Sequence, residues 1–390
     1  MLISALLFIV ACSRFEPPLP ADEDVLDGPL AGLTTAQNSQ FLAGDIAFNN
    51  EKFNSSTGLG PLFVAASCGG CHAGDGKGTP FTTLTRFGQT DSTGNHFLSM
   101  GGPQLQNRSL PGFDPEIIPA GATFSKFTPP ANTGLGFIEL VPESDILAMA
   151  DPLDANGDGI SGVPNWNSVP AYVNIPSNSV TNNGKHICRF GKKAATFNLM
   201  QQTVTAYNQD MGIASSYMPT DTWSGLYSDH EVTDNRVNNV VAYLQMLKAP
   251  VQRSQNDSKV ITGNIIFKQI GCNKCHVETL QTGFSPVSAL SYKQFHPYSD
   301  LLLHDMGPGL DDGYTEGSAL TSEWRTPPLW GLGLSPKSQG GNYFLMHDGR
   351  ARSITEAILL HGGEGDQSRN DFIALPPAEK EMLLKFLESL

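Results

Sequence analysis

The chain has 390 residues, and 39% of them are hydrophobic, enough for one large or two medium-sized cores. Its net charge of -14 and its pI near 5.0 argue against nucleic-acid binding and leave an acidic surface for a basic redox partner. Its 40 glycines and 27 prolines are many for a helical protein and predict long ordered loops.

The N-terminus resembles an export signal. Residues 2–10 form an apolar run that is too short to span a bilayer, and Ala11 and Cys12 follow it. This pattern resembles a bacterial lipoprotein signal that is cleaved before a lipid-bearing cysteine, although no basic residue follows Met1. A start misassigned from further upstream and an uncleaved anchor are the alternatives. We expect residues 1–12 to be the signal, residues 13–30 a linker, and the protein to be exported as a lipoprotein of the periplasmic outer-membrane face or cell envelope.

Two copies of the pentapeptide Cys-x-x-Cys-His are the most informative features, at residues 68–72 (CGGCH) and 272–276 (CNKCH). This pentapeptide is the attachment site of c-type haem, in which both thiols form thioethers and the histidine binds the iron. One zinc site made of four cysteines is the alternative, but it would need neither histidine. The motifs predict two covalently bound haems held by Cys68, Cys71, His72, Cys272, Cys275 and His276.

The sequence around these motifs is repeated. A helix candidate with the pattern Gly-x-x-x-Phe precedes each motif, with Gly44 and Phe48 in the first half and Gly263 and Phe267 in the second. Each half closes with apolar residues three or four apart, which define one helical face: Tyr243, Leu244 and Leu247, then Phe386, Leu387 and Leu390. This arrangement resembles the crossed terminal helices of the cytochrome c fold. We expect a mainly α protein of two cytochrome c-like domains with long irregular loops, residues 31–250 with a loop-rich insertion and residues 251–390.

The insertion contains the sequence DANGDGISG, in which Asp154, Asn156 and Asp158 alternate and Gly159 follows. Alternating oxygen ligands followed by glycine match the opening half of an EF-hand calcium loop. Asn165 stands at the twelfth position, where a bidentate glutamate is usual. A calcium site and a metal-free turn rich in Asp, Asn and Gly are therefore equal alternatives.

Longer stretches resemble a known family, including residues 58–72, 151–162, 300–313, 323–333 (EWRTPPLWGLG) and 346–364 (MHDGRARSITEAILLHGGE). They are similar to bacterial di-haem oxidoreductases, a family labelled peroxidase or thiol oxidoreductase and related to the di-haem cytochrome c peroxidases. The resemblance implies a periplasmic electron-transfer oxidoreductase of peroxidase type that reduces hydrogen peroxide and takes electrons from a small periplasmic redox protein.

Two residues depart from the labels of that family. Cys188 is the one cysteine left after the lipid and haem cysteines are assigned, and a dithiol oxidoreductase needs two, so we expect a buried, unreactive thiol. The segment RFGKKA, residues 189–194, resembles a family segment that commonly carries tryptophan where this chain has Lys192. A role of an aromatic side chain in electron transfer between the haems is therefore not expected at this position.

The resemblance also implies distal contacts for the second haem. Residues 346–361 are similar to the peroxidase segment that ends in a distal methionine ligand, and His361 stands at that end. His276 and His361 are therefore the predicted iron ligands, with His347, Met346 and His304 as alternatives. Arg325 and Arg350 are predicted to pair with haem propionates, because a guanidinium matches a carboxylate in geometry and charge.

For the first haem the sequence leaves the choice open. His96 and Met100 lie in a glycine-rich loop after CGGCH, and either or neither could reach the iron. Gln104, Gln106 and Glu116 are candidates for a peroxide pocket, but no spacing identifies a catalytic residue.

The iron ligands decide the function, because an iron with two protein ligands carries electrons whereas an open position can bind peroxide. The alternative to a peroxidase is therefore a non-enzymatic electron carrier with two saturated haems. A third interpretation is modification of another protein, by similarity to the di-haem enzyme that matures a tryptophan-derived quinone.

Overall fold

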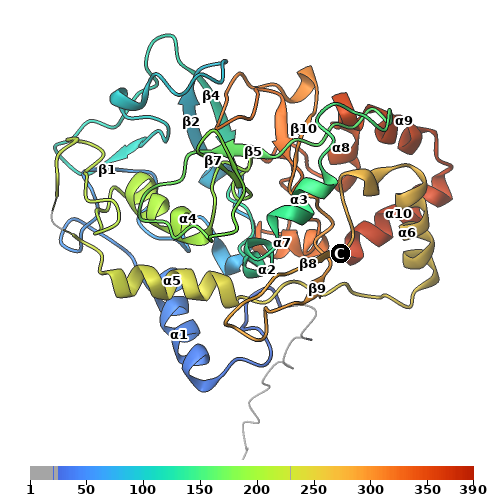
Figure 1. Cartoon of the computed structure of the whole chain (residues 1–390), viewed down its shortest axis with the longest axis horizontal. Coiled ribbons are helices and arrows are strands. Elements are labelled where there is room, and N and C mark those ends of the chain that lie inside the picture. The colour runs from blue at the N-terminus through green and yellow to red at the C-terminus, as the bar shows by residue number, and fades with distance from the viewer. Residues whose placement is uncertain (1–20, 22–24, 229) are drawn as a thin grey trace, which may run out of the picture.

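The computed structural model describes residue 21 and residues 25–228 and 230–390 (Figure 1). The predicted lipoprotein signal, with Cys12, lies outside these ranges, as does most of the predicted linker. Every helix within them is too short or too polar to cross a membrane.

The described residues contain helices, short strands and long irregular segments. The α-helices are α1 (Thr35–Asp45), α2 (Leu135–Glu139), α3 (Glu143–Met149), α4 (Leu199–Thr205), α5 (Asp234–Met246), α6 (Ser258–Gln269), α7 (Ser335–Ser338), α8 (Ile354–Leu359), α9 (Asp366–Ala374) and α10 (Pro377–Ser389). Single turns of π-helix, η2 (Ile46–Asn50) and η6 (Ala206–Asp210), extend α1 and α4. Short 3-10 turns are η3 (Ala73–Asp75), η4 (Pro80–Thr82), η5 (Leu98–Met100), η7 (Cys272–Lys274), η8 (Pro308–Leu310), η9 (Leu332–Leu334) and η10 (Gly363–Gly365).

The strands are two to five residues long and form small antiparallel sheets. They are β1 (Leu62–Phe63) with β3 (Arg108–Ser109), β2 (Leu84–Gly88) with β4 (Thr123–Phe127), β5 (Asn165–Asn167) and β6 (Thr181–Asn182) on either side of β7 (Lys185–Cys188), β8 (Leu280–Gln281) with β9 (Gln294–Phe295), and β10 (Leu303–Asp305) with β11 (Glu323–Arg325). The structure is 33% helical with about 12% strand. The predicted mainly α class is therefore wrong: the fold is mixed, because the long loops pair through short sheets instead of adding helices.

A close crossing of α1 and α5 forms the first helix pair, at the lower left of Figure 1. A Cβ atom added at Gly44 would lie 2.1 Å from the Asn239 carbonyl oxygen and 2.5 Å from the Tyr243 Cβ, so only glycine fits. The ring of Phe48 packs beside this contact, 5.5 Å from that of Tyr243 between centroids. The contact predicted from Gly44 and Phe48 is present.

The second helix pair repeats this contact with α6 and α10, at the right of Figure 1. A Cβ atom at Gly263 would lie 2.1 Å from the Met382 carbonyl oxygen and 2.6 Å from the Phe386 Cβ. The rings of Phe267 and Phe386 lie 5.4 Å apart between centroids. The internal repeat read from the sequence thus corresponds to two helix pairs of the same construction.

We expect Gly263→Ala to destabilise the protein by about 1 to 3 kcal/mol, because the added methyl group must push α6 away from α10. The matched control is Gly309→Ala, since a Cβ atom there would meet nothing within 4 Å. Thermal unfolding of the haem-loaded protein measures the difference. Equal melting temperatures for both variants would show that the helix contact is loose.

The largest hydrophobic core crosses the predicted domain boundary. Most of its buried residues belong to residues 41–247, but Leu280, Phe295, Leu301, Leu302 and Trp330 are also part of it. A second core joins α6, α8 and α10 through residues such as Phe267, Ile354 and Leu383. The division at residue 250 stays a prediction, and the segment after it packs on both cores.

Candidate haem site

One cavity runs between the two Cys-x-x-Cys-His motifs. Its volume is about 410 Å³, within the range of about 300 to 1000 Å³ of an ordinary small-molecule site. Its wall includes all four motif cysteines, both motif histidines and His361. Strands β2 and β4 contribute Leu84, Arg86 and Phe127, whereas β10 and β11 contribute His304, Trp324 and Arg325. The fold thus brings two motifs that are about 200 residues apart in sequence to one space.

Each motif histidine uses one ring nitrogen in a hydrogen bond to a backbone carbonyl oxygen. Nδ1 of His72 lies 2.9 Å from the Pro130 carbonyl oxygen, and Nδ1 of His276 lies 2.9 Å from that of Tyr298. Burial lowers the pKa of each imidazole to about 4, so both are neutral at pH 7. A neutral imidazole that donates through Nδ1 leaves the Nε2 lone pair for a metal. Both residues therefore fit the proximal iron ligand of a haem.

The four motif cysteines are unpaired, half-buried thiols at the cavity wall. Burial raises the pKa of Cys68 and Cys272 to about 12 and that of Cys71 to about 11. Each pair lines the cavity together with its own motif histidine, which fits the thioether prediction better than one shared zinc site.

His361 faces the same cavity from the end of α8. Its Nδ1 lies 2.8 Å from the Ala357 carbonyl oxygen, one helical turn earlier. Burial lowers the pKa of His361, and His361 is close enough to His276 to contribute to the lowered pKa of that residue. The second motif thus has a second neutral histidine nearby, with Nε2 again without a hydrogen-bond partner among the described residues.

Comparison with known proteins decides the family. Residues 126–390, more than half of the chain, match the family described as "Di-haem oxidoreductase, putative peroxidase". The chain belongs to this family. The match includes the second motif and begins after the first, so the first haem rests on the CGGCH motif and the cavity geometry. The resemblance predicted from the sequence is confirmed.

Two further comparisons add little. A solved structure of Kuenenia stuttgartiensis hydrazine synthase, pressurized with xenon, is similar over 100% of this chain and 100% of that chain, with 14% identity and a TM-score of 0.40. No curated protein matches the chain. The family membership implies haem cofactors and electron-transfer chemistry for this di-haem oxidoreductase.

His304 is occupied by two carboxylates and does not fit an iron ligand. Its Nε2 lies 2.8 Å from Asp300 Oδ2, and its Nδ1 lies 2.6 Å from Glu364 Oε2. Burial alone would lower the pKa of His304, but hydrogen bonds with Asp300, Cys275 and Glu364 raise it to about 12. A protonated imidazole has no lone pair for a metal. The geometry therefore favours a structural role for His304 beside Cys275, whose Sγ lies 3.6 Å from Nδ1.

His347 and Met346 also line the cavity but differ in their surroundings. The ring of His347 stacks on Trp324 with centroids 3.7 Å apart and planes 10° apart, and its Nε2 lies 3.4 Å from Asp312 Oδ2. Met346 packs on two hydrophobic clusters. The Nε2 of His347 faces a carboxylate, whereas Nε2 of His361 has no partner among the described residues. The thioether of Met346 has no backbone hydrogen bond among these residues that would orient it.

Of the two arginines predicted to bind propionates, one lines the cavity and the other does not. Arg325 lies at the cavity wall, where its Nε donates to the Gly191 carbonyl oxygen at 3.0 Å. Arg350 is exposed, pairs with Asp348 at 2.8 Å and does not line the cavity. The geometry supports a propionate contact for Arg325 and does not bring Arg350 to the site.

Residues 154–160 pack beside the second haem motif. Asp158 Oδ2 lies 3.3 Å from the Nζ of Lys274, which is within CNKCH, and Ser161 Oγ donates to Glu364 Oε1 at 2.5 Å. The oxygens expected to bind calcium accept backbone N–H groups: Asp154 Oδ1 and Asn156 Oδ1 both from Asp158, each at 2.9 Å. These hydrogen bonds form in a turn with or without a metal, so calcium stays a prediction.

The candidates for a distal ligand or a peroxide pocket at the first haem lie outside the cavity wall. His96 and Met100 are exposed in the loop after β2. Gln104, Gln106 and Glu116 are also absent from the wall. Gln106 Nε2 donates to the Gln209 carbonyl oxygen at 3.0 Å, and Glu116 Oε2 accepts from the Gln106 N–H at 2.6 Å. These two therefore support the chain next to Asp210 rather than facing the cavity.

Sequence reasoning missed Asp210 and Arg86, which do face the cavity near the first motif. The charge of Asp210 raises the pKa of both Cys68 and Cys71, which places the carboxylate close to both thiols. Burial raises the pKa of Asp210 to about 6, and Arg86 opposes that rise. Arg86 forms a partly buried ion pair with Glu316, which lies 230 residues later in the sequence and also lines the cavity. No spacing links these residues, so only the fold reveals them.

Cys188 is buried, as predicted, and burial raises the pKa of its thiol to about 12. It does not line the cavity between the haem motifs. The thiol lies on β7, 3.7 Å from the His186 carbonyl oxygen. A thiol that stays protonated and buried has little reactivity, so the structure gives no support to literal thiol oxidoreduction.

Proposed function

We propose that this di-haem oxidoreductase is an exported peroxidase that holds two c-type haems. Cys68, Cys71 and His72 would hold the first haem. Cys272, Cys275 and His276 would hold the second, with His361 as its distal ligand. Bound haem iron would supply the centre at which electrons are delivered to hydrogen peroxide. The observation that carries the proposal is one cavity whose wall holds His276 and His361 at the second motif and His72 at the first.

The asymmetry of the two sites gives each a role. With both His276 and His361 bound to its iron, the second site would have the arrangement of an electron carrier. The other cavity-lining histidines among the described residues are engaged, because His304 lies between two carboxylates and His347 stacks on Trp324. The second site would therefore accept electrons from a small redox protein, and the first would bind peroxide.

Asp210 fits the role of the residue that would transfer protons at the first site. Reduction of hydrogen peroxide consumes two electrons and two protons and gives two waters, so a group must move protons between the oxygens. No ion pair or side-chain hydrogen bond occupies the Asp210 carboxylate among the described residues, and its pKa of about 6 lies near neutral pH. Asp210 would take the proton from peroxide and return it to the departing oxygen.

Steady-state oxidation of a reduced small cytochrome tests the proposal. We expect addition of hydrogen peroxide to cause catalytic oxidation of the donor, with two donor molecules consumed for each peroxide. Oxidation that stops once each haem of the protein has accepted an electron would instead support the non-enzymatic carrier. The donor, the export and the lipid on Cys12 are parts of this proposal, and labelling with a fatty acid in parent and Cys12→Ala cells tests the anchor.

A further inference from the structure

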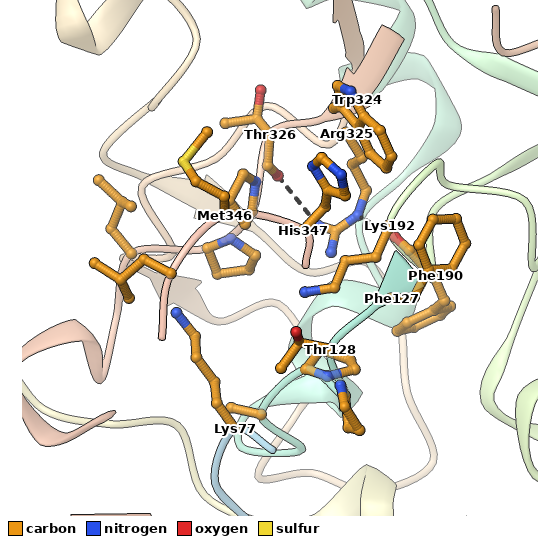
Figure 2. Close-up of a pocket in the computed structure, with 18 of the residues that line it drawn as sticks. Lys77, Phe127, Thr128, Phe190, Lys192, Trp324, Arg325, Thr326, Met346 and His347 are labelled. Carbon is orange, nitrogen blue, oxygen red and sulfur yellow. Dashed lines mark hydrogen bonds between the residues drawn. The ribbon is translucent and has the colours of Figure 1, made fainter. Parts of the chain in front are cut away.

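Two lysines without partners extend into the middle of the cavity. Figure 2 shows the side chains of Lys77 and Lys192 entering the same space from different sides, near Arg325. Neither ammonium has a hydrogen bond or an ion pair among the described residues. Lys77 follows His72 by five positions, and Lys192 precedes a second lysine of quite different surroundings.

The neighbouring Lys193 is a buried lysine whose ammonium group has hydrogen-bond partners. Lys193 donates to the carbonyl oxygens of Leu320, Thr321 and Glu323 at 2.8 to 3.1 Å, and its Nζ lies 3.8 Å from the ring centroid of Trp324. Lys192 has no such partners, although its own carbonyl oxygen accepts from the Arg325 N–H at 3.0 Å. The backbone therefore fixes Lys192 beside Arg325 while its ammonium stays free.

Three like charges in one cavity are unfavourable unless an anion joins them. Burial, together with the charges of Lys77 and Arg325, lowers the pKa of Lys192 to about 7. Burial also lowers the pKa of Lys77 to about 8 and that of Arg325 to about 10. The carboxylate that acts on Lys192, Asp348, is already paired with Arg350 at 2.8 Å. Buried cations are normally paired, and among the described residues no carboxylate forms an ion pair with Lys77 or Lys192.

We propose that Lys77 and Lys192 bind the propionate carboxylates of the first haem, beside Arg325. This rests on the proposed haem binding at His72. A haem attached through its vinyl groups to Cys68 and Cys71 directs its propionates away from that edge and into the cavity. The charge of Lys192 acts on His72, so this lysine lies near the first site. The sequence did not single out either lysine for this contact.

The midpoint potentials of both haems in Lys77→Gln, Lys192→Gln and the double variant test the proposal. Loss of a cation leaves the propionate charge unbalanced and favours ferric iron. At the parent midpoint potential we therefore expect the ferrous-to-ferric ratio of the first haem to fall roughly three- to tenfold per lysine. The second haem is expected to shift less. Lys126→Gln is the matched control, because Lys126 is exposed on β4 next to the cavity residue Phe127.

An unchanged first-haem potential in the haem-loaded double variant, or an equal shift in Lys126→Gln, would overturn the proposal. So would a dependence of the parent potential on added phosphate that the double variant lacks, since the lysines would then bind a soluble anion. If a glutamine variant loses haem, the arginine variant decides: recovered haem content supports a need for charge, and equal loss contradicts it. Absence of peroxide turnover in all proteins would refute the peroxidase function while leaving the potentials as evidence on the propionates.

Discussion

Replacing His361 by alanine is expected to convert the second haem from low-spin to high-spin. The Ala357 carbonyl oxygen holds Nδ1 of His361, so its Nε2, on a neutral ring at the cavity wall, has no hydrogen-bond partner among the described residues. Alanine leaves the sixth position of the iron without a protein ligand, and a weak ligand such as water gives a high-spin ferric signal. Electron paramagnetic resonance of the oxidised variant measures the change, and added imidazole should restore the low-spin signal.

His347→Ala is the matched comparison, since His347 also lines the cavity and was an alternative ligand. We expect this variant to keep a low-spin second haem. In the parent, the His347 ring stacks on Trp324, so its position does not require a bond to the iron. A low-spin spectrum that survives in His361→Ala and disappears in His347→Ala would transfer the ligand assignment to His347.

Asp210→Asn is expected to lower peroxide turnover by about 100-fold or more, which is the usual contribution of a positioned acid–base group. The amide keeps the size of the carboxyl group but cannot accept a proton. Because burial raises the pKa of Asp210 to about 6, the parent activity should rise as pH increases through that value, when the carboxylate forms. The variant should lack this rise. Stopped-flow mixing with peroxide at a series of pH values measures both effects.

Glu116→Gln separates the two carboxyl candidates. Glu116 lies off the cavity wall and binds the Gln106 N–H, so its amide variant should keep the parent pH profile and most of the activity. Haem spectra identical to those of the parent are required for both variants, so that a loss of activity reports the chemistry. A large loss in Glu116→Gln with normal turnover in Asp210→Asn would reject the assignment of Asp210.

Local patterns predicted much of this molecule. Each Cys-x-x-Cys-His motif contains its chemistry within five residues, so its interpretation needs no knowledge of the fold. The helix contacts were also visible, because a glycine four residues before a phenylalanine leaves the space that Tyr243 and Phe386 fill. Cys188 was recognised as buried by elimination.

Properties that depend on distant segments could not be predicted in the same way. Strands of two to five residues show no clear alternation, so the sheets were missed and the helical content was overestimated. His96 and Met100 lie close to CGGCH in sequence, but their loop points into solvent. Asp210 reaches the first site only because η6 extends α4 toward Cys68 and Cys71. A pair such as Arg86 with Glu316 spans 230 residues.

Electron paramagnetic resonance with paired optical spectra, recorded before and after one-electron reduction, tests the central claim most directly. The account predicts two haems per chain, a low-spin signal from the second haem, and a high-spin signal from the first in at least one of these states that is lost on adding peroxide. Two low-spin haems in both states would contradict the open first site and identify an electron carrier. A protein without haem signals would contradict the assignment of both motifs.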